Sequence, residues 1–432
     1  MESPRRLAYL MSEHPAVATS FITRELARLR ALDFDIHVAS INLPARRLDS
    51  MPIDEREEVS RTFYVKPEGI IGVLFAHVSL LFKAPWQYLR GLFFALGLGK
   101  RDPGRMAYSF FYFSEALLIG QWMRSLNLTH LHVHFANAAA TVGLIVSQVF
   151  DTSLSLTVHG SDEFYDVNGH LLKEKIAGAS FICCIGQYTR SQLMRVSSSS
   201  EWDKFEVVPC GIDTRVFRPR DFRLNPSPFE ILCVARLVAG KGHTILLAAL
   251  RQLLQEGRKA RLRLVGDGPE RHQIEREVAR LGLADHVIFE GAVNQDRIGD
   301  FYSCADTFVL ASFAEGIPIV LMEAMAMEIP CVSTFVGGIP ELIRNDIDGI
   351  LVVPSDYQGL AAALERLISE PDLRRRLGTA GRRRVVDKYN LDRNAEHLGR
   401  IFSSHLNLPA TGLEYTRRCP EELRRPAQAN VD

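Results

Sequence analysis

Short apolar segments of strand length alternate with longer helical segments along most of the chain, and this alternation constrains the fold more than any other feature. The segments that we predict as strands in the first half are residues 7–11, 35–39, 131–135, 154–158, 181–184 and 206–209. Those in the second half are residues 230–234, 261–265, 287–289, 307–310, 330–333 and 349–352. Alternating strands and helices favour parallel sheets covered on both faces, so we expect two doubly wound α/β halves.

The length of the chain agrees with two halves, because 432 residues exceed what one ordinary core holds. The polar, proline-containing stretch 213–228 separates the two strand series. We therefore place a first domain at residues 1–214 and a second at residues 215–390. Residues 409–432 are polar and show no periodicity, so we expect a disordered tail there.

Composition and charge narrow the class of protein. A hydrophobic content of 47% with 24% charged residues is typical of a folded globular chain. Lys and Arg together number 51, as do Asp and Glu, so no overall field would attract nucleic acid. The seven cysteines show no Cys-x-x-Cys spacing and mostly lie in apolar runs, which favours a reducing cytoplasm over a zinc site.

Membrane insertion is not expected from the apolar pattern. The first residues lead directly into the predicted strand 7–11, which argues against a signal peptide. No uninterrupted run reaches the ~20 apolar residues that span a bilayer. The most apolar stretch, residues 69–99, is broken by polar residues and by Pro85. Two interpretations stay open: a buried helical pair, or an element whose aromatic and basic side chains contact an anionic membrane.

Two glutamates stand eight positions apart around the sequence Gly316-Ile317-Pro318. Glu315 falls in the loop after the predicted strand 307–310, and Glu323 about a turn and a half into a helix that starts near the proline. A helix N-terminus offers unpaired N–H groups and a positive dipole end to phosphate. With a carboxylate on each side, this unit suits a sugar nucleotide. The alternative is an ordinary strand–loop–helix unit with two solvated glutamates.

Two cations flank a glycine-rich turn after the predicted strand 230–234. Arg236 and Lys241 surround Gly240, and Gly242 follows. Cations in this place can neutralise the charge that develops on a diphosphate leaving group, which is the kind of preorganised stabilisation that contributes most to catalysis. They would replace a divalent metal, so we expect neither a metal nor another cofactor. The alternative is a pair of surface cations at a strand end.

Histidines gather at the carboxyl ends of two first-half strands. His159 ends the predicted strand 154–158, and His130, His132 and His134 alternate along the strand before it. Ligands of parallel sheets bind at the carboxyl ends of strands, so we expect His159 and His134 in a cleft between the halves. We expect His130 and His132 to be packing or surface groups rather than metal ligands.

These motifs, taken in order, resemble those of retaining glycosyltransferases of family 4. Residues 231–242 resemble the family's arginine-x4-lysine element, 264–269 its next strand and loop, and 314–326 its glutamate-x7-glutamate motif. Residues 336–341 are similar to the loop that follows this motif, and 207–213 to the turn that leads into the interdomain linker. His159 to Asp162 look like the family's histidine-gly-x-asp element.

The resemblance implies a GT-B fold, in which two Rossmann-like domains face a central cleft and a helix, here at residues 391–408, crosses back onto the first domain. It also implies roles for individual residues. The residues implied in catalysis are His159, Arg236, Lys241 and Glu315. Those implied in donor binding are Gly266, Gly268, Glu315, Gly316, Ile317, Val320 and Glu323, and those on the acceptor side are His134, Asn137 and Asp162.

The start of the chain departs from the glycine-glycine loop of many members. Residues 11–25 are similar instead to the start of members that build bacterial exopolysaccharides such as colanic acid, with Ala18-Thr19-Ser20 at the position of a Ser-Glu-Thr. The resemblance therefore implies transfer of a hexose from a nucleotide diphosphate sugar, UDP-linked in preference to GDP-linked, to a saccharide on a lipid carrier. We expect the protein in the cytoplasm, and peripheral contact with the inner face of the membrane stays open.

Two other functions remain open from the sequence. A sugar-nucleotide hydrolase or epimerase on the same fold would act without an acceptor. A non-catalytic sugar-nucleotide-binding subunit would need no clamp on the leaving group, and the set formed by His159, Arg236, Lys241, Glu315 and Glu323 weighs against it.

Overall fold

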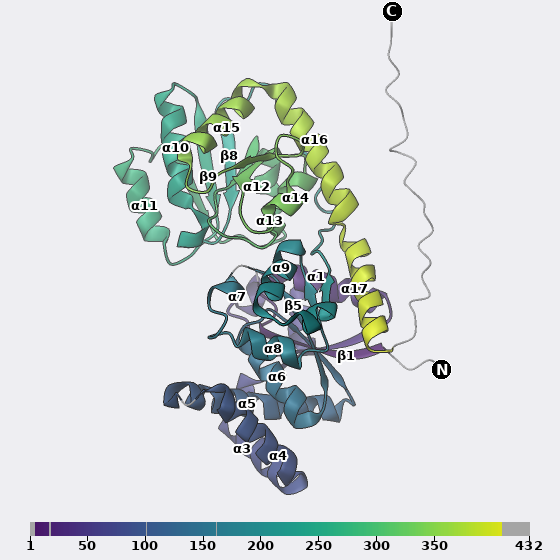
Figure 1. The fold of residues 1–432 in the computed structure, drawn as a ribbon. Helices are drawn as coiled ribbons and strands as arrows, with labels where there is room; N and C mark the ends of the chain where they lie inside the picture. The colour runs from purple at the N-terminus through teal and green to yellow at the C-terminus, as the bar shows by residue number, and fades with distance from the viewer. Residues whose placement is uncertain (1–4, 17–18, 101, 161, 408–432) are drawn as a thin grey trace, which may run out of the picture.

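The computed structural model describes residues 5–16, 19–100, 102–160 and 162–407, which form two parallel β-sheets one above the other (Figure 1). The first sheet has the strand order β3-β2-β1-β4-β5-β6-β7. Its strands are β1 (Arg5–Glu13), β2 (Phe34–Asn42), β3 (Thr62–Tyr64), β4 (His130–His134), β5 (Ser153–Val158), β6 (Phe181–Cys184) and β7 (Phe205–Val207). All neighbouring strands are parallel, and the order reverses between β1 and β4, which marks the ligand-binding crevice of such sheets.

The second sheet repeats this plan with the order β10-β9-β8-β11-β12-β13. Its strands are β8 (Phe229–Val234), β9 (Ala260–Val265), β10 (Val287–Gly291), β11 (Thr307–Leu310), β12 (Cys331–Thr334) and β13 (Ile350–Val352). They are also parallel throughout, and the order reverses between β8 and β11. The predicted pair of doubly wound α/β halves is therefore confirmed.

Helices cover both faces of each sheet. Those of the first half are α1 (Ser20–Ala31), α2 (Ile53–Arg61), α3 (Gly69–Lys83), α4 (Pro85–Leu98), α5 (Pro103–Ser125), α6 (Ala138–Phe150), α7 (Asp162–Tyr165), α8 (Leu172–Gly178) and α9 (Gln187–Val196). Those of the second half are α10 (His243–Gln255), α11 (Arg271–Arg280), α12 (Ile298–Cys304), α13 (Ile319–Ala326), α14 (Ile339–Leu342), α15 (Tyr357–Ser369), α16 (Pro371–Lys388) and α17 (Leu391–His405). The 3₁₀ turns η2 (Leu48–Ser50), η3 (Lys66–Glu68), η4 (Ser199–Lys204) and η5 (Ala239–Lys241) complete the described elements.

Successive side chains of a strand point to opposite faces of the first sheet, and each face has its own hydrophobic core. In β1, Leu7 and Tyr9 are buried against α1 and α17, whereas Ala8 and Leu10 join the core beneath α5 and α6. This is the period of two that a strand covered on both faces requires.

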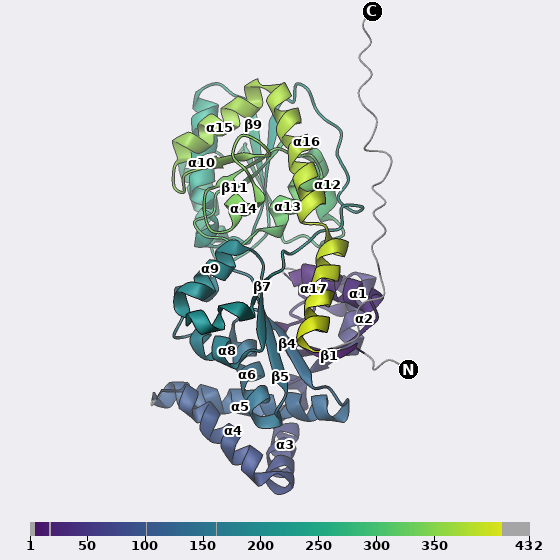
Figure 2. The same cartoon turned by 45° about the vertical axis from the view of Figure 1, so that its right-hand side comes forward.

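The last helix leaves the second sheet and packs on the first. The backbone N–H of Ile212 donates to the carbonyl of Tyr389, and the N–H of Leu391 donates to Ile212, at the point where the chain turns from α16 into α17. α17 then lies beside α1 (Figure 2), and its Phe402 is fully buried 5.0 Å from the ring of His132. Residues 408–432, including the predicted tail, lie outside the described residues. The domain limits at 214 and 390 stay predictions.

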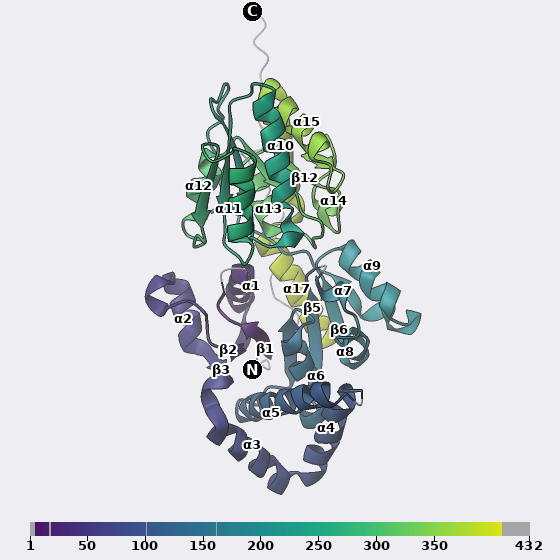
Figure 3. The ribbon, with the colours of Figure 1, turned by 90° about the vertical axis from the view of Figure 1, so that its left-hand side faces the viewer.

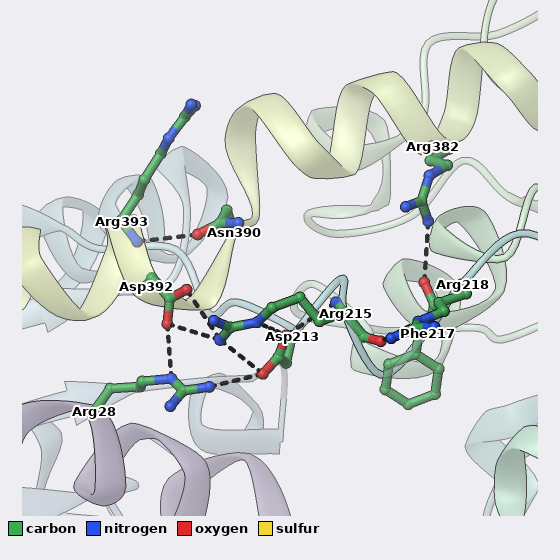
Figure 4. Close-up of polar contacts among 9 residues, drawn as sticks. All are labelled: Arg28, Asp213, Arg215, Phe217, Arg218, Arg382, Asn390, Asp392 and Arg393. Atoms are coloured by element: carbon green, nitrogen blue, oxygen red, sulfur yellow. Dashed lines mark hydrogen bonds and ion pairs between the residues drawn. The ribbon is translucent and has the colours of Figure 1, made fainter. Parts of the chain in front are cut away.

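Charged side chains hold this junction between the two units. Arg28 of α1 contacts Asp213 and Asp392, at 2.7 Å in each case, and Arg215 contacts the same two carboxylates at 2.9 and 3.1 Å (Figure 4). Burial opposes ionisation of Asp213, but hydrogen bonds from Arg215 and the charge of Arg28 outweigh it and lower the pKa of Asp213.

In the first half, the sequence did not predict one strand and left the burial of one helical stretch open. The edge strand β3 has three residues, too few to produce a recognisable period. Residues 69–99 do form a helical pair, α3 and α4, but much of its apolar surface is exposed rather than buried. None of the helices in the described ranges is long and apolar enough to cross a membrane.

Candidate active site

Lys241, in the loop after β8, forms an ion pair with Glu315, the first of the two motif glutamates. Nζ of Lys241 lies 2.5 Å from Oε1 of Glu315, which also accepts a hydrogen bond from Oγ of Ser312 at 2.6 Å. Gly242 follows at φ +64°, and a Cβ there would lie 2.0 Å from the carbonyl oxygen of Ala311, so only glycine fits. The two loops therefore meet closely enough to hold the lysine and the glutamate together.

Arg236 lies in the same loop and is exposed, with no hydrogen-bond or ion-pair partner within the described ranges. The loop that follows β9 packs directly on the backbone around it. A Cβ on Gly266, at φ +137°, would lie 2.0 Å from the carbonyl oxygen of Ala235, and one on Gly268 would lie 2.4 Å from that of Leu237. Both glycines thus serve close packing, and the guanidinium remains available to an anion.

The turn that carries Glu315 is wedged against the first sheet. A Cβ on Gly316 would lie 2.0 Å from the carbonyl oxygen of His159. On its other side, a Cβ on Gly337, at φ +53°, would lie 1.8 Å from the carbonyl oxygen of Glu315. The glutamate loop is therefore fixed between the histidine of the first unit and the loop after β12.

The helix after this turn starts slightly later than predicted. Pro318 occupies the N-cap position instead of the first turn, and α13 begins at the next residue, so Glu323 is the fifth residue of the helix. Ile317 is buried and points toward Gly186 of the first unit. The carbonyl of Val320 accepts a hydrogen bond from the Tyr302 hydroxyl at 3.2 Å.

Glu323 is buried among donors from three other elements. Its carboxylate accepts hydrogen bonds from Nε2 of Gln295 at 2.7 Å and from the Tyr302 hydroxyl at 3.0 Å, and Arg24 of α1 lies 3.5 Å away. Burial raises the pKa of Glu323, although Arg24 and the two hydrogen bonds oppose this shift. Of the two neutral donors that hold this carboxylate, Gln295 lies in a loop, whereas Tyr302 is fully buried.

A chain of hydrogen bonds connects His159 to α1. Nε2 of His159 lies 2.9 Å from Nδ1 of His134, and Nε2 of His134 lies 3.1 Å from the carboxylate of Glu25. The Tyr9 hydroxyl donates to the same carboxylate at 3.1 Å. At the other end, Nδ1 of His159 lies 3.8 Å from the sulfur of Cys210. Both nitrogens of His159 are therefore engaged within the first unit.

The partners of this chain set its proton positions. A carboxylate oxygen accepts hydrogen bonds, so we assign the hydrogen on Nε2 of His134 to the bond with Glu25 and let Nδ1 of His134 accept from Nε2–H of His159. Burial, followed by the nearby His134, lowers the pKa of His159 well below its usual value, so its ring stays neutral. His159 consequently has both ring nitrogens engaged, and its carbonyl packs against Gly316.

His130 and His132 are buried and pack against aromatic side chains, which confirms the packing role among the two roles predicted for them. All three histidines of β4 face one side of the sheet, because residues two apart share a face. His132 bonds to the hydroxyls of Ser155 and Thr157 on β5 at 2.7 and 2.9 Å. Burial lowers the pKa of His130 to about 3. A ladder of serine and threonine hydroxyls thus satisfies neutral histidines.

The other two residues predicted on the acceptor side have different places. Asn137 caps α6, accepting from the N–H of Ala139 at 3.0 Å, and Asp162 is exposed at the start of α7. Its neighbour Glu163 is buried and accepts the N–H groups of His159 and Gly160, both at 2.8 Å. Glu163 therefore shapes the loop in which His159 sits.

The two units also touch through the loop after β12. The carboxylate of Glu341 accepts the N–H groups of Gln187 and Tyr188, at 2.7 and 2.6 Å, and so caps the N-terminus of α9 in the first unit. This contact, together with the packing of Gly316 on His159 and the position of Arg24 beside Glu323, brings the carboxyl ends of the two sheets together.

An Asp-x-Asp triplet is the usual signature of a divalent-metal clamp on a diphosphate. The chain has two such triplets, at residues 33–35 and 346–348. Both lie at the amino ends of strands, away from the cleft, and Asp35, Asp346 and Asp348 pair with arginines. Among the described residues, no group of three or more His, Cys, Asp or Glu side chains could hold a metal ion. Metal independence stays a prediction.

Several residues of the cleft escaped sequence reasoning. Gln295, Tyr302 and Ser312 contact the motif glutamates from elements that carry no recognisable pattern. Arg24 and Glu25 lie in the stretch that resembles the exopolysaccharide enzymes, but the resemblance gave them no role.

Comparison with known proteins shows similarity to glycosyltransferases. Residues 217–384 match the family model described as "Glycosyl transferases group 1". A protein of Escherichia coli (strain K12), provisionally named as the colanic acid biosynthesis glycosyltransferase WcaL, is 38% identical over 168 residues, which cover 38% of this chain and 41% of that protein. The GDP-mannose-dependent alpha-(1-6)-phosphatidylinositol monomannoside mannosyltransferase of Mycobacterium tuberculosis (strain H37Rv) is 30% identical over 51% of this chain and 61% of its own length. The matches thus span less than two thirds of these relatives.

Solved structures extend the likeness of fold to nearly the whole chain. Anabaena Alr3699/HepE in complex with UDP superimposes with a TM-score of 0.69 at 19% identity, over 93% of this chain and 100% of that one. Sucrose-phosphate synthase from Thermosynechococcus elongatus gives 0.71 at 22% identity, over the same shares of the two chains. At these identities the likeness concerns the fold, which is the predicted GT-B arrangement.

Proposed function

We propose that this chain, whose residues 217–384 form a glycosyl transferases group 1 domain, transfers a hexose from a nucleotide diphosphate sugar to a saccharide. The observation that carries the proposal is the buried carboxylate of Glu323, which Gln295 and Tyr302 hold on the helix that follows Glu315. The loop after β8 adds the exposed Arg236 and pairs Lys241 with Glu315. A nucleotide sugar needs these groups together, since it carries ribose hydroxyls, a diphosphate and a sugar.

In the proposed complex, Glu323 exchanges Gln295 for ribose hydroxyls. Arg236 and Lys241 contact the diphosphate, whose negative charge increases as the glycosidic bond breaks. Glu315 and the N–H groups of Gly316, Ile317 and Val320 face the transferred sugar and phosphate. Gly266 and Gly268 let the backbone approach the nucleoside.

Retention of configuration forms part of the proposal. Glu315 is bonded to Lys241 and Ser312, so it is held for hydrogen bonding rather than poised as a nucleophile. A front-face displacement, in which the leaving phosphate takes the acceptor's proton, therefore fits better than a covalent glycosyl-enzyme. His159, kept neutral by burial, supports the donor loop through its carbonyl against Gly316.

Donor and acceptor are proposed from relatives. We infer a UDP-sugar in preference to a GDP-sugar, and a structural neighbour solved with UDP supports this choice. One relative is named for GDP-mannose, so a GDP-sugar is the alternative. The acceptor would be a lipid-linked saccharide of an exopolysaccharide, met at the cytoplasmic face of a membrane. The relative named for colanic acid biosynthesis supports this choice.

One assay separates this proposal from its rivals. The protein is incubated with UDP-, GDP- and ADP-sugars, and release of the nucleoside diphosphate is measured with and without a lipid-linked saccharide extract. Transfer predicts release that depends on the extract. Equal release without it would indicate a hydrolase, and stabilisation of the protein by a nucleotide sugar without any turnover would indicate a binding subunit.

A further inference from the structure

The first unit carries a concentrated apolar surface on α3, α4 and the first half of α5. Of the 25 large apolar side chains that are exposed in the described ranges, 13 lie between residues 70 and 111. Ile71 is 84% exposed, Phe82 81% and Trp86 78%. A monomeric protein does not usually leave such a contiguous patch facing water, so this surface calls for a partner.

The exposed side chains form a defined face. On α3 they recur three or four residues apart and continue into α4. We call this surface the elbow face; it consists of Ile70, Ile71, Leu74, Phe75, Val78, Leu81, Phe82, Trp86, Leu89 and Phe93. The opposite side of both helices is buried: Ala76 and Leu80 of α3 and Ala95 of α4 join the core with α5 and α6. The helices are therefore anchored, and the elbow face is an outer surface of a packed layer.

The position of this face leaves it accessible. α3 and α4 form an elbow at the end of the molecule farthest from the second sheet (Figures 1 and 3). The candidate active site lies at the opposite end of the first sheet, where the carboxyl ends of the strands meet the second unit. A partner on the elbow face would leave the cleft open.

Charge indicates which partner. Residues 69–101 contain no aspartate or glutamate. Arg90 and Lys100 pair with acids of neighbouring elements, at 2.6 and 2.9 Å. Lys83 at the elbow and Arg105 at the start of α5 are exposed, and neither side chain has a partner in the part of the chain that the structure describes. Unpaired cations at the border of an apolar, aromatic surface match anionic headgroups above acyl chains.

A second copy of the chain fits less well. In a two-fold symmetric dimer each elbow face would meet the same face of the other copy, where residues 69–101 offer Lys83 no acid to neutralise it; the exposed acids Glu68 and Asp102 lie only at the two ends of this stretch. Anionic lipid supplies that neutralisation.

We propose that the elbow face docks on an anionic lipid bilayer, with its apolar side chains in the headgroup boundary and Lys83 and Arg105 on lipid phosphates. This inference rests on the proposed function in one respect, that a lipid-linked acceptor gives docking a purpose. The surface itself is independent of donor binding.

Sedimentation with vesicles tests the proposal. The protein is mixed at low salt with vesicles of phosphatidylcholine alone or with added phosphatidylglycerol. Sedimentation should require phosphatidylglycerol and decline at high salt. The double variant Lys83→Glu with Arg105→Glu should bind on the order of 30-fold more weakly, and Phe82→Ser with Trp86→Ser at least about tenfold. The controls are Arg251→Glu with Lys259→Glu, two exposed cations of the second unit, and Trp202→Ser. Both should bind like the parent.

The thermal melting temperature of each variant, compared with that of the parent, verifies that the variant is folded. A parent protein that does not sediment with anionic vesicles overturns the proposal. So does a parent that sediments in the centrifuge as a dimer which Phe82→Ser with Trp86→Ser dissociates, because the face would then bind another copy. Vesicle binding without any sugar transfer would instead refute the proposed function alone.

Discussion

Arg236 differs from the other charged side chains of the cleft, because it is exposed and has no partner within the described residues. Lys241, by contrast, neutralises Glu315 in the free protein. The two cations of one loop should therefore affect stability differently while serving the same leaving group.

Replacement of Arg236 by alanine should lower turnover by about tenfold to several hundredfold. This is the rate factor that corresponds to the loss of one charge-assisted hydrogen bond of roughly 1.5–3 kcal/mol. The free energy of unfolding should change by less than about 0.5 kcal/mol, as for other surface substitutions. Lys241→Ala should reduce turnover similarly and also destabilise the fold, since Glu315 loses its counter-ion. Initial rates and urea unfolding measure both quantities, with Lys259→Ala as control. Turnover within about twofold of the parent for both variants would remove these cations from the mechanism.

Glu323 makes stability depend on pH in a predictable direction. Its pKa is raised above the usual 4.5, so the folded state holds the proton more tightly than the unfolded state. The stability gained from this difference is present below pH 4.5 and lost as pH rises through the folded pKa. Glu323→Gln should therefore gain stability relative to the parent as pH rises through this window, while nucleotide affinity falls. Denaturant unfolding across pH, without ligand, measures this. A parallel pH dependence of parent and variant would contradict the assignment.

The motif residues could be placed from the sequence because each lies in one short contiguous stretch. Glu315 and Glu323 share a loop and a helix, and Arg236 and Lys241 share a turn. The partners of Glu323 could not be placed. Gln295, Tyr302 and Arg24 come from three separate parts of the chain, and only the packing of α1 and α12 around α13 brings them together.

Among helices and strands, those with a long apolar pattern in the sequence were predicted best. Buried parallel strands are apolar runs, so their limits were predicted within a few residues, whereas β3 was missed because it has three. The outer stripe of α3 and α4 resembles a core stripe in sequence, and only the structure shows that Phe82 and Trp86 face outward. The alternation of β4 alone could not show that serine and threonine hydroxyls hydrogen-bond to the buried His132.

The cap that Glu341 places on α9 connects two elements of different units. Glu341→Ala removes the acceptor of two backbone N–H groups, and loss of a helix cap costs about 0.5–2 kcal/mol. We expect a lower melting temperature and a larger radius of gyration in X-ray scattering, because this contact also holds the units together. Glu256→Ala, which loses only an exposed hydrogen bond from Gln252 at the end of α10, is the control. An unchanged radius would show that other contacts set the closure.

For the whole molecule, the second sheet supplies both cations, Arg236 and Lys241, that we assign to the proposed leaving group. We therefore expect full activity in excess EDTA, because Arg236 and Lys241 supply the positive charge that a metal would otherwise supply. Rates measured after extensive chelation test this. Complete loss of activity that Mg²⁺ or Mn²⁺ restores would overturn metal independence.

The account as a whole depends on sugar transfer at the cleft between the two sheets. Its most direct test is to isolate the acceptor after incubation with the donor that stabilises the protein most, and to determine by NMR the anomeric configuration of the added sugar. We expect one hexose per nucleoside diphosphate released, in the configuration of the donor, and no product from the Arg236→Ala, Lys241→Ala double variant. Nucleotide release without a glycosylated acceptor, or a product of inverted configuration, would contradict the proposed function or its mechanism.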